Sequence, residues 1–150
     1  MSHDLPPAPL VFITGASSGI GQALALRYAR AGYRLALVAR RSGELQTWAQ
    51  TQGWVDSTCR IYNADVSDAT SIVAAGADCL ADQGLPDVVI ANAGISIGMD
   101  TAERDDIDVM ARTFATNNTG MAATFQPFVA AMARRGSGTL VGIASVAAIR

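Results

Sequence analysis

The stretch LVFITGASSGIG, residues Leu10 to Gly21, joins a short apolar run to a turn rich in glycine. The apolar run 10–14 is typical of a buried strand. The residues that follow, 18–32, have the periodicity of an amphipathic helix and reach Gly32, a residue type that commonly ends helices. A buried strand, a glycine-rich turn and a helix in this order predict the first unit of a parallel α/β sheet.

The same alternation continues along the rest of the chain. Further strands are predicted at 33–39, 58–64, 87–93 and 138–144, and further helices at 42–52, 67–83 and 105–135. Strands that alternate with helices predict right-handed crossovers and one parallel sheet. Such a sheet binds ligands at the carboxyl ends of its strands, so the residues just after each strand are the candidates for function.

Composition agrees with one buried sheet and argues against several classes of protein. Half of the 150 residues are hydrophobic and 16% are charged, which suits a single domain whose sheet is covered on both faces. The net charge of −2 argues against nucleic acid as a partner. No apolar run approaches the length of a membrane span, and the Pro-rich start lacks a signal pattern. We therefore expect a flexible tail at 1–9, a domain at 10–150 and a cytoplasmic protein.

The two cysteines, Cys59 and Cys79, lie in apolar contexts without the spacing of metal ligands. They are expected to be reduced thiols in the core, and no metal site is expected.

The glycine-rich turn is a candidate phosphate-binding loop. Glycines at 15, 19 and 21 permit a tight turn and a close approach of the backbone to a phosphate. The N–H groups at the start of the next helix would face the anion. A glycine-rich turn without any ligand is the alternative. A nucleoside triphosphate loop is argued against because it needs a lysine, and all eleven basic residues are arginines.

The end of the second strand indicates which dinucleotide would bind. NAD sites commonly place an acid there to bind the ribose 2′-hydroxyl, but this chain has Ala39 followed by Arg40. A guanidinium at this point would pair with a 2′-phosphate. These two residues favour NADP(H) over NAD(H), and the alternative is an exposed arginine that opens the next helix.

Polar side chains also follow the third and fourth strands. Asp65 would accept a hydrogen bond from an adenine amino group, or would share the capping of a helix with Ser67 and Asp68. Asn92 in the stretch 92–94, NAG, would tie neighbouring strand ends together, and the small residues after it would let the backbone approach a cofactor. A simple turn that ends the strand is the alternative.

The long helix and the fifth strand carry three further candidates. Asn117 follows Phe114 by three positions and so lies on the apolar face, where a buried amide without partners costs about 1–3 kcal/mol. This predicts a structural-water or active-site role for Asn117. Pro127 predicts a kink or break in the helix. Ser145 follows the fifth strand and is either a reactive hydroxyl or a small residue at a strand end.

Taken together, these motifs resemble the short-chain dehydrogenases/reductases. The shared motifs are TGASSGIG (14–21), NADV (63–66), NAG (92–94), N-x-x-G (117–120) and the serine after the fifth strand, in this order. The resemblance covers residues 10–150. It implies a Rossmann-type, doubly wound fold of three α/β/α layers. It also implies an NADP(H)-dependent oxidoreductase that acts on a small carbonyl or alcohol substrate, commonly as a homo-oligomer.

The resemblance implies roles for individual residues as well. Ser145 would hydrogen-bond the reacting oxygen of the substrate, and Asn117 would help to hold a water in a proton relay. Arg40 corresponds to the basic residue of members that prefer NADP. The residues that would contact the cofactor are Gly15, Ser17, Ser18, Gly19, Ile20, Gly21, Arg40, Asp65, Val66, Asn92, Ala93 and Gly94.

One departure from the family pattern is large. The family's acid/base is a tyrosine with a lysine four residues later, and this sequence contains no lysine. The family places that pair shortly after the serine, so we expect a domain truncated after its fifth strand and inactive by itself. An exposed fifth strand is an aggregation hazard, and a stable monomer is not expected. A non-catalytic dinucleotide-binding or interaction module is the alternative hypothesis.

Overall fold

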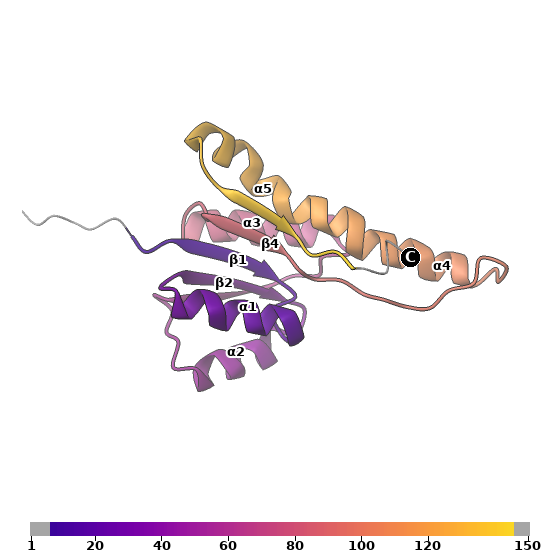
Figure 1. The fold of residues 1–150 in the computed structure, drawn as a ribbon, viewed down its shortest axis with the longest axis horizontal. Helices are drawn as coiled ribbons and strands as arrows, with labels where there is room; N and C mark the ends of the chain where they lie inside the picture. The colour runs from indigo at the N-terminus through magenta and orange to yellow at the C-terminus, as the bar shows by residue number, and fades with distance from the viewer. Residues whose placement is uncertain (1–6, 146–150) are drawn as a thin grey trace, which may run out of the picture.

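The computed structural model describes residues 7–145 and contains one parallel sheet with helices on both faces (Figure 1). The strands are β1 (Leu10–Thr14), β2 (Arg34–Ala39), β3 (Cys59–Asn63), β4 (Val88–Ala91) and β5 (Thr139–Gly142). The helices are α1 (Gly19–Arg30), α2 (Ser42–Thr51), α3 (Ala69–Asp82), α4 (Asp106–Phe114) and α5 (Gly120–Arg135), and a π-helical segment, η1 (Ala115–Thr119), joins α4 to α5. Residues 1–6 of the predicted tail lie outside the described range.

The order of the strands makes the sheet doubly wound. The order is β3-β2-β1-β4-β5 and every neighbouring pair is parallel. The chain moves outward from β1 through β2 to β3, then returns to the other side of β1 for β4 and β5. The winding therefore reverses beside β1, and in such sheets the crevice at the carboxyl end of this point is where ligands bind. The predicted α/β fold class is confirmed.

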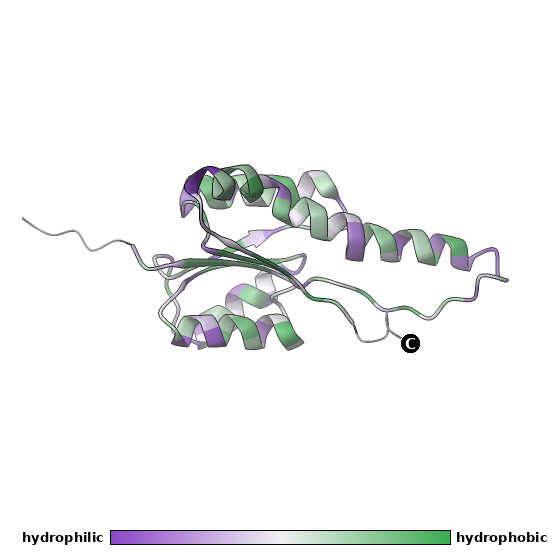
Figure 2. Ribbon diagram, turned by 45° about the horizontal axis from the view of Figure 1, so that its top comes forward, coloured by the Kyte–Doolittle hydropathy of each residue, from purple (hydrophilic) through white to green (hydrophobic). Residues whose placement is uncertain are grey.

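Two apolar cores, one on each face, hold the sheet between its helices. Successive strand residues point to opposite faces, so Phe12 joins Ile72 of α3 and Phe128 of α5. Its neighbour Ile13 joins Leu45 of α2 on the other face. The Phe12 and Phe128 ring centroids are 5.0 Å apart. Figures 1 and 2 show α1 and α2 on one face and α3 and α5 on the other, with the apolar strands between them.

The two cysteines lie in these cores, as predicted. Cys59 and Cys79 are buried free thiols, and burial raises the pKa of each to about 12. Both thiols are therefore protonated and poorly reactive near neutral pH.

Residues 7–145 contain neither a candidate metal site nor a candidate membrane-spanning helix. No group of three or more His, Cys, Asp or Glu side chains is arranged to hold a metal ion. None of the helices in this range combines the length and apolarity that crossing a membrane requires.

Of the kink or break predicted at Pro127, the break is wrong. Helix α5 continues through Pro127, and the irregular segment is η1, further toward the N-terminus. Pro127 packs against Gly76 of α3, where a Cβ would lie only 2.5 Å from the proline Cγ. The missing side chain on α3 makes room for the ring, so packing between the two helices offsets the lost backbone hydrogen bond.

The fifth strand lies at one end of the strand order, as predicted. Within the described residues β5 pairs with β4 alone. Its Leu140 is 41% exposed, in contrast to the buried residues of β1. The stability of the chain as a monomer stays a prediction.

Candidate functional site

A pocket of about 800 Å³ lies at the carboxyl ends of β1 to β4. Its lining includes every predicted cofactor contact except Gly21: Gly15, Ser17, Ser18, Gly19, Ile20, Arg40, Asp65, Val66, Asn92, Ala93 and Gly94. These residues come from four separate loops, and the doubly wound topology is what brings the loops to the same edge of the sheet.

The glycine-rich loop depends on two glycines that no other residue could replace without movement. Gly15 has a φ of +65°, and a Cβ there would lie 2.8 Å from the Cα of Ala93. A Cβ on Gly21 would overlap the carbonyl oxygen of Gly15. Gly21 does not line the pocket, and its missing side chain lets the first turn of α1 pack onto the loop.

The start of α1 faces the pocket with its backbone donors uncapped by its own N-cap side chain. Ser18 is the N-cap residue and has extended dihedral angles, but its side chain makes no capping hydrogen bond. The first turn of α1 also has no acidic residue. Gln22 donates from Nε2 to the carbonyl oxygen of Ser17 at 3.0 Å and so braces the loop. The positive end of the helix dipole at this point favours an anion.

Thr14 and Asn92 fasten the ends of β1 and β4 together. The Thr14 hydroxyl oxygen accepts from the backbone N–H groups of Asn92 and Ala93, both at 3.1 Å. The Asn92 side chain donates from Nδ2 to the carbonyl oxygens of Thr14 at 3.1 Å and Gly15 at 3.3 Å. Asn92 thus ties the strand ends, as predicted, and holds the glycine-rich loop in place. Sequence reasoning missed the buried hydroxyl of Thr14, because its partners are far along the chain.

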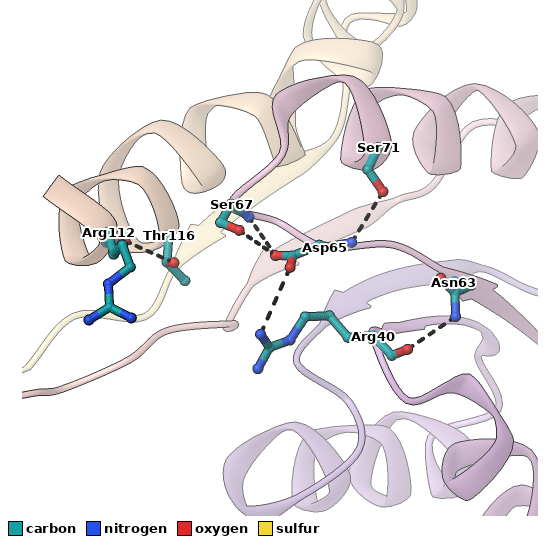
Figure 3. A network of polar contacts seen from close by, with 7 residues as sticks. All are labelled: Arg40, Asn63, Asp65, Ser67, Ser71, Arg112 and Thr116. Atoms are coloured by element: carbon teal, nitrogen blue, oxygen red, sulfur yellow. Dashed lines mark hydrogen bonds and ion pairs between the residues drawn. The ribbon is translucent and has the colours of Figure 1, made fainter. Parts of the chain in front are cut away.

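Asp65 forms a polar network with Ser67 and Arg40 (Figure 3). Its Oδ1 accepts from the Ser67 backbone N–H at 2.9 Å and from the Ser67 hydroxyl at 2.7 Å. Its Oδ2 lies 3.8 Å from Nη1 of Arg40. Partial burial pushes the pKa of Asp65 upward, but the two Ser67 hydrogen bonds and Arg40 outweigh it and hold the pKa below its usual range. Asp65 is therefore a carboxylate near neutral pH.

The cap of α3 is Asp68 and not Asp65. The Asp68 carboxylate accepts from the backbone N–H groups of Thr70 at 2.9 Å and Ser71 at 3.3 Å. The alternative role of Asp65, a cap shared with Ser67 and Asp68, is wrong, because the Asp65 carboxylate accepts from Ser67 instead. The carboxylate of Asp65 remains at the pocket.

Arg40 is held at its backbone, and its guanidinium is exposed. Asn63 of β3 donates from Nδ2 to the Arg40 carbonyl oxygen at 3.1 Å and to the Ser42 hydroxyl at 2.9 Å. The side chain of Arg40 is 71% exposed, and its pair with Asp65 is long. Exposed ion pairs of this kind contribute about 0–1 kcal/mol. An incoming anion would therefore displace the guanidinium from Asp65 easily.

Asn117 lies in η1 and is bonded to the loop after β4. Its Oδ1 accepts from the Ile95 backbone N–H at 2.9 Å, and its Nδ2 donates to the Ile95 carbonyl oxygen at 2.8 Å. A Cβ on Gly94 would lie 3.3 Å from Asn117 Oδ1, so the glycine permits this close approach. The amide of Asn117 is therefore half-buried and bonded to backbone groups. Phe114, from which the apolar face was predicted, is 57% exposed, so that face is not fully buried. An amide has further donor and acceptor capacity, and the water-relay role stays a prediction.

Ser145 is the last residue that the structure describes. It follows β5 and is exposed, and it is not part of the pocket lining. The role of its hydroxyl toward a substrate stays a prediction.

Sequence reasoning missed several residues that line the pocket, among them Arg41, Arg112 and Thr116. Arg41 could have been found from the sequence, because it directly follows Arg40. The other two come from α4 and η1, and their approach to the strand ends is a tertiary feature that no local pattern reports.

A doubly wound parallel sheet with a glycine-rich loop before the helix at its switch point defines the dinucleotide-binding class of α/β proteins. Comparison with known proteins identifies the family within this class. A sequence profile described as short chain dehydrogenase matches residues 9–150. The chain belongs to the short chain dehydrogenase family.

Individual relatives agree with this assignment. An uncharacterized oxidoreductase of Myxococcus xanthus is 36% identical over 138 residues, which are 92% of this chain and 54% of that protein. The crystal structure of a short-chain dehydrogenase from Streptomyces avermitilis has a TM-score of 0.82 at 31% identity and matches 92% of this chain and 49% of that one. An alcohol dehydrogenase from the archaeon Thermococcus sibiricus, solved with 5-hydroxy-NADP, has a TM-score of 0.77 at 33% identity over 89% of this chain and 57% of that one. The chain thus spans about half the length of the relatives it matches.

Proposed function

We propose that these residues form the cofactor-binding part of an oxidoreductase that moves a hydride between NADP(H) and the carbonyl or alcohol carbon of a small substrate. The observation that carries the proposal is the pocket itself. It joins the uncapped start of α1, the weakly paired Arg40 and the carboxylate of Asp65 at the switch point of the sheet. The Thermococcus relative solved with an NADP derivative supports the same choice of cofactor.

The residues present fit each part of this cofactor. The loop from Gly15 to Gly21 and the N–H groups of α1 would hold the pyrophosphate. The guanidinium of Arg40 would leave Asp65 for the 2′-phosphate, and Ala39 offers no acid to a 2′-hydroxyl. Asp65 would accept from the adenine amino group. The small residues Ala93 and Gly94 would leave room for the ribose next to the nicotinamide, which supplies or accepts the hydride when bound.

The substrate side of the proposal rests on two residues. Ser145 would donate a hydrogen bond to the substrate oxygen, and Asn117 would support the relay that delivers a proton to it. The 150 residues contain no lysine and therefore no Tyr-x-x-x-Lys pair. The activity is accordingly proposed for the whole protein, whose relatives are about twice as long as this chain. The same missing pair favours the second candidate, a dinucleotide-binding module without catalysis.

The cofactor proposal is tested with Arg40→Ala in the protein expressed from its complete gene. The dissociation constants for NADP⁺ and NAD⁺ are measured by calorimetry. Loss of a charge-assisted contact should reduce the preference for NADP⁺ by about 10- to 100-fold. Arg134→Ala, an exposed arginine at the far end of α5, is the matched control and should leave the preference unchanged. An Arg40→Ala protein with the wild-type preference would refute the 2′-phosphate role.

Turnover separates the two candidate functions. Reduction of carbonyl compounds with NADPH is assayed for wild type and Ser145→Ala. We expect wild-type turnover and a large loss in the variant, because the hydrogen bond to the substrate oxygen is removed. A protein that binds NADP⁺ but reduces none of a broad set of carbonyl compounds would support the non-catalytic module. A fully active Ser145→Ala enzyme would return Ser145 to a structural role.

We also propose that the protein is a cytoplasmic homo-oligomer. The oligomer is supported by exposed apolar side chains on the α4–α5 stretch, where Phe114 is 57% exposed and Val129 is 45% exposed. Light scattering of the full gene product should give a mass at least twice that of the chain.

A further inference from the structure

The pocket contains three arginines, and their ionic partners differ. Arg40 lies beside Asp65, and Nε of Arg41 lies 3.3 Å from a carboxylate oxygen of Glu44. Arg112 also lines the pocket, yet no carboxylate within residues 7–145 forms an ion pair with it. A cation that lines a pocket without an acidic partner is placed to interact with a ligand.

The position of Arg112 follows from the helical segment that carries it. Arg112 belongs to α4, one turn before Thr116 of η1, and the Thr116 hydroxyl donates to the Arg112 carbonyl oxygen at 3.1 Å. Both residues line the pocket. This hydrogen bond ties the backbone of Arg112 to the π-helical segment, which Asn117 in turn fastens to Ile95. The base of the Arg112 side chain is therefore well fixed.

Arg112 and Arg40 reach the pocket from opposite layers of the molecule. Arg40 comes from the turn between β2 and α2, and α2 covers the face of the sheet opposite to α3 and α5. Arg112 comes from the helical stretch that continues into α5. In Figure 3 the side chain of Arg112 extends away from the helical ribbon that carries it, and Ser67, Asp65 and Arg40 lie on the other side of the view.

We propose that Arg112 is a recognition residue for the adenine ring, with its guanidinium plane lying against the base from the α4 side, opposite Arg40. The inference rests on the proposed function, because that function places the adenine amino group at Asp65. A planar guanidinium stacks well on a flat aromatic ring, and its charge adds a cation–π attraction. Arg112 breaks no ion pair within the described residues to make this contact, whereas Arg40 must leave Asp65.

The test uses the two halves of the cofactor as separate probes on the full gene product. Adenosine 2′,5′-bisphosphate carries the adenine, and nicotinamide mononucleotide carries a phosphate but no adenine. Arg112→Ala should weaken the binding of adenosine 2′,5′-bisphosphate by about 3- to 30-fold and that of the mononucleotide by less than about 2-fold. Arg112→Lys should resemble Arg112→Ala toward the adenine probe, because an ammonium group cannot lie flat on a ring.

The matched control is Arg104→Ala. Arg104 is an exposed arginine just before α4 and does not line the pocket. Its Nη1 lies 3.9 Å from Oδ1 of Asp108. Circular dichroism melts show that each variant is folded. Equal weakening of both probes by Arg112→Ala would mean general electrostatic attraction and would overturn the proposal, as would wild-type affinity in Arg112→Lys.

The failure of this inference is distinguishable from the failure of the proposed function. A wild-type protein that binds neither NADP⁺ nor adenosine 2′,5′-bisphosphate contradicts the proposed function. A wild-type protein that binds both, with Arg112→Ala indistinguishable from Arg104→Ala, contradicts only the role of Arg112.

Discussion

Helices α1 and α3 both begin just after a strand of the same sheet, yet their first turns are capped differently. In α3 the Asp68 carboxylate accepts from two backbone N–H groups and closes the helix end. In α1 the Ser18 side chain makes no such bond, and the glycine-rich loop brings that end to the pocket. The difference separates a helix start that its N-cap side chain closes from one that its N-cap side chain leaves open beside the pocket.

The uncapped end of α1 has an energetic consequence. A hydrogen bond from an N-cap side chain stabilises a folded protein by about 0.5–2 kcal/mol. Helix α1 lacks this contribution, because the Ser18 side chain makes no such bond. Buried contacts compensate, since Ala25 of α1 is fully buried in the core that α1 and α2 share with the sheet. A bound anion would supply the missing hydrogen bonds. Four substitutions or conditions test this contrast, and they are arranged from the largest expected effect to the smallest.

Gly21→Ala should separate the start of α1 from the glycine-rich loop and have the largest effect on NADP⁺ binding. The added Cβ overlaps the Gly15 carbonyl oxygen, so the loop must move away from the helix. We expect affinity for NADP⁺ to fall by about 100-fold or more, with a loss of about 1–3 kcal/mol in the free energy of unfolding. Calorimetry and urea denaturation measure the two effects.

Gly43→Ala is the control for Gly21→Ala. Gly43 lies in the first turn of α2, and a Cβ there meets no atom within 4 Å. This substitution should leave binding unchanged and stabilise the protein by up to about 1 kcal/mol, because alanine favours helices. Equal behaviour of the two variants would contradict the packing role of Gly21.

Ser18→Asp should make the start of α1 resemble that of α3. The new carboxylate would cap the helix and stabilise the protein by about 0.3–1 kcal/mol. It would also repel the pyrophosphate, so affinity for NADP⁺ should fall by about 10- to 100-fold. Opposite signs for stability and binding are the expected signature, with Ser18→Ala as the uncharged control. Unchanged binding in Ser18→Asp would show that this helix end does not face the cofactor phosphates.

Asp68→Ala should remove the cap of α3 and affect stability alone. The expected loss is about 0.5–2 kcal/mol, because two backbone N–H groups lose their partner. Asp68→Asn retains a capping oxygen and should stay close to wild type. Affinity for NADP⁺ should change by less than about 2-fold in both variants. A large change in NADP⁺ affinity would contradict the view that the start of α3 serves stability alone.

The pH dependence that Asp65 adds should be the smallest effect. Its pKa in the folded protein lies below the value of about 4 for an unfolded chain. A depressed pKa contributes stability that is fully present above pH 4 and is lost as the pH falls through the folded pKa. Asp65→Asn should therefore show a shallower loss of stability between pH 5 and 3 in urea titrations. The Asp65 side chain is 41% exposed, so the effect is expected to be small. An identical slope in wild type and variant would contradict the network in Figure 3.

Much of the fold was predictable because its determinants are local. Each predicted strand and helix before the long one lies within two residues of the observed bounds, and the same holds for the fifth strand. Buried parallel strands are short apolar runs, and such runs are visible in any single stretch of sequence. The long helix was predicted less well. The π-helical segment at Asn117 and the continuity of α5 through Pro127 depend on Ile95 and on Gly76, and both are distant in the chain.

The candidate site shows the same division. The sequence by itself determined the strand–loop–helix units and placed a glycine-rich loop, Arg40, Asp65 and Asn92 after successive strands, because turn and cap chemistry is encoded in neighbouring residues. Only the tertiary structure decided that Thr14 would hold the end of β4, that Asp65 would lie beside Arg40, and that Arg112 would line the pocket. The physical reason is that hydrogen bonds and charges act over a few ångströms in space, and the packing of the layers alone sets which distant residues come that close.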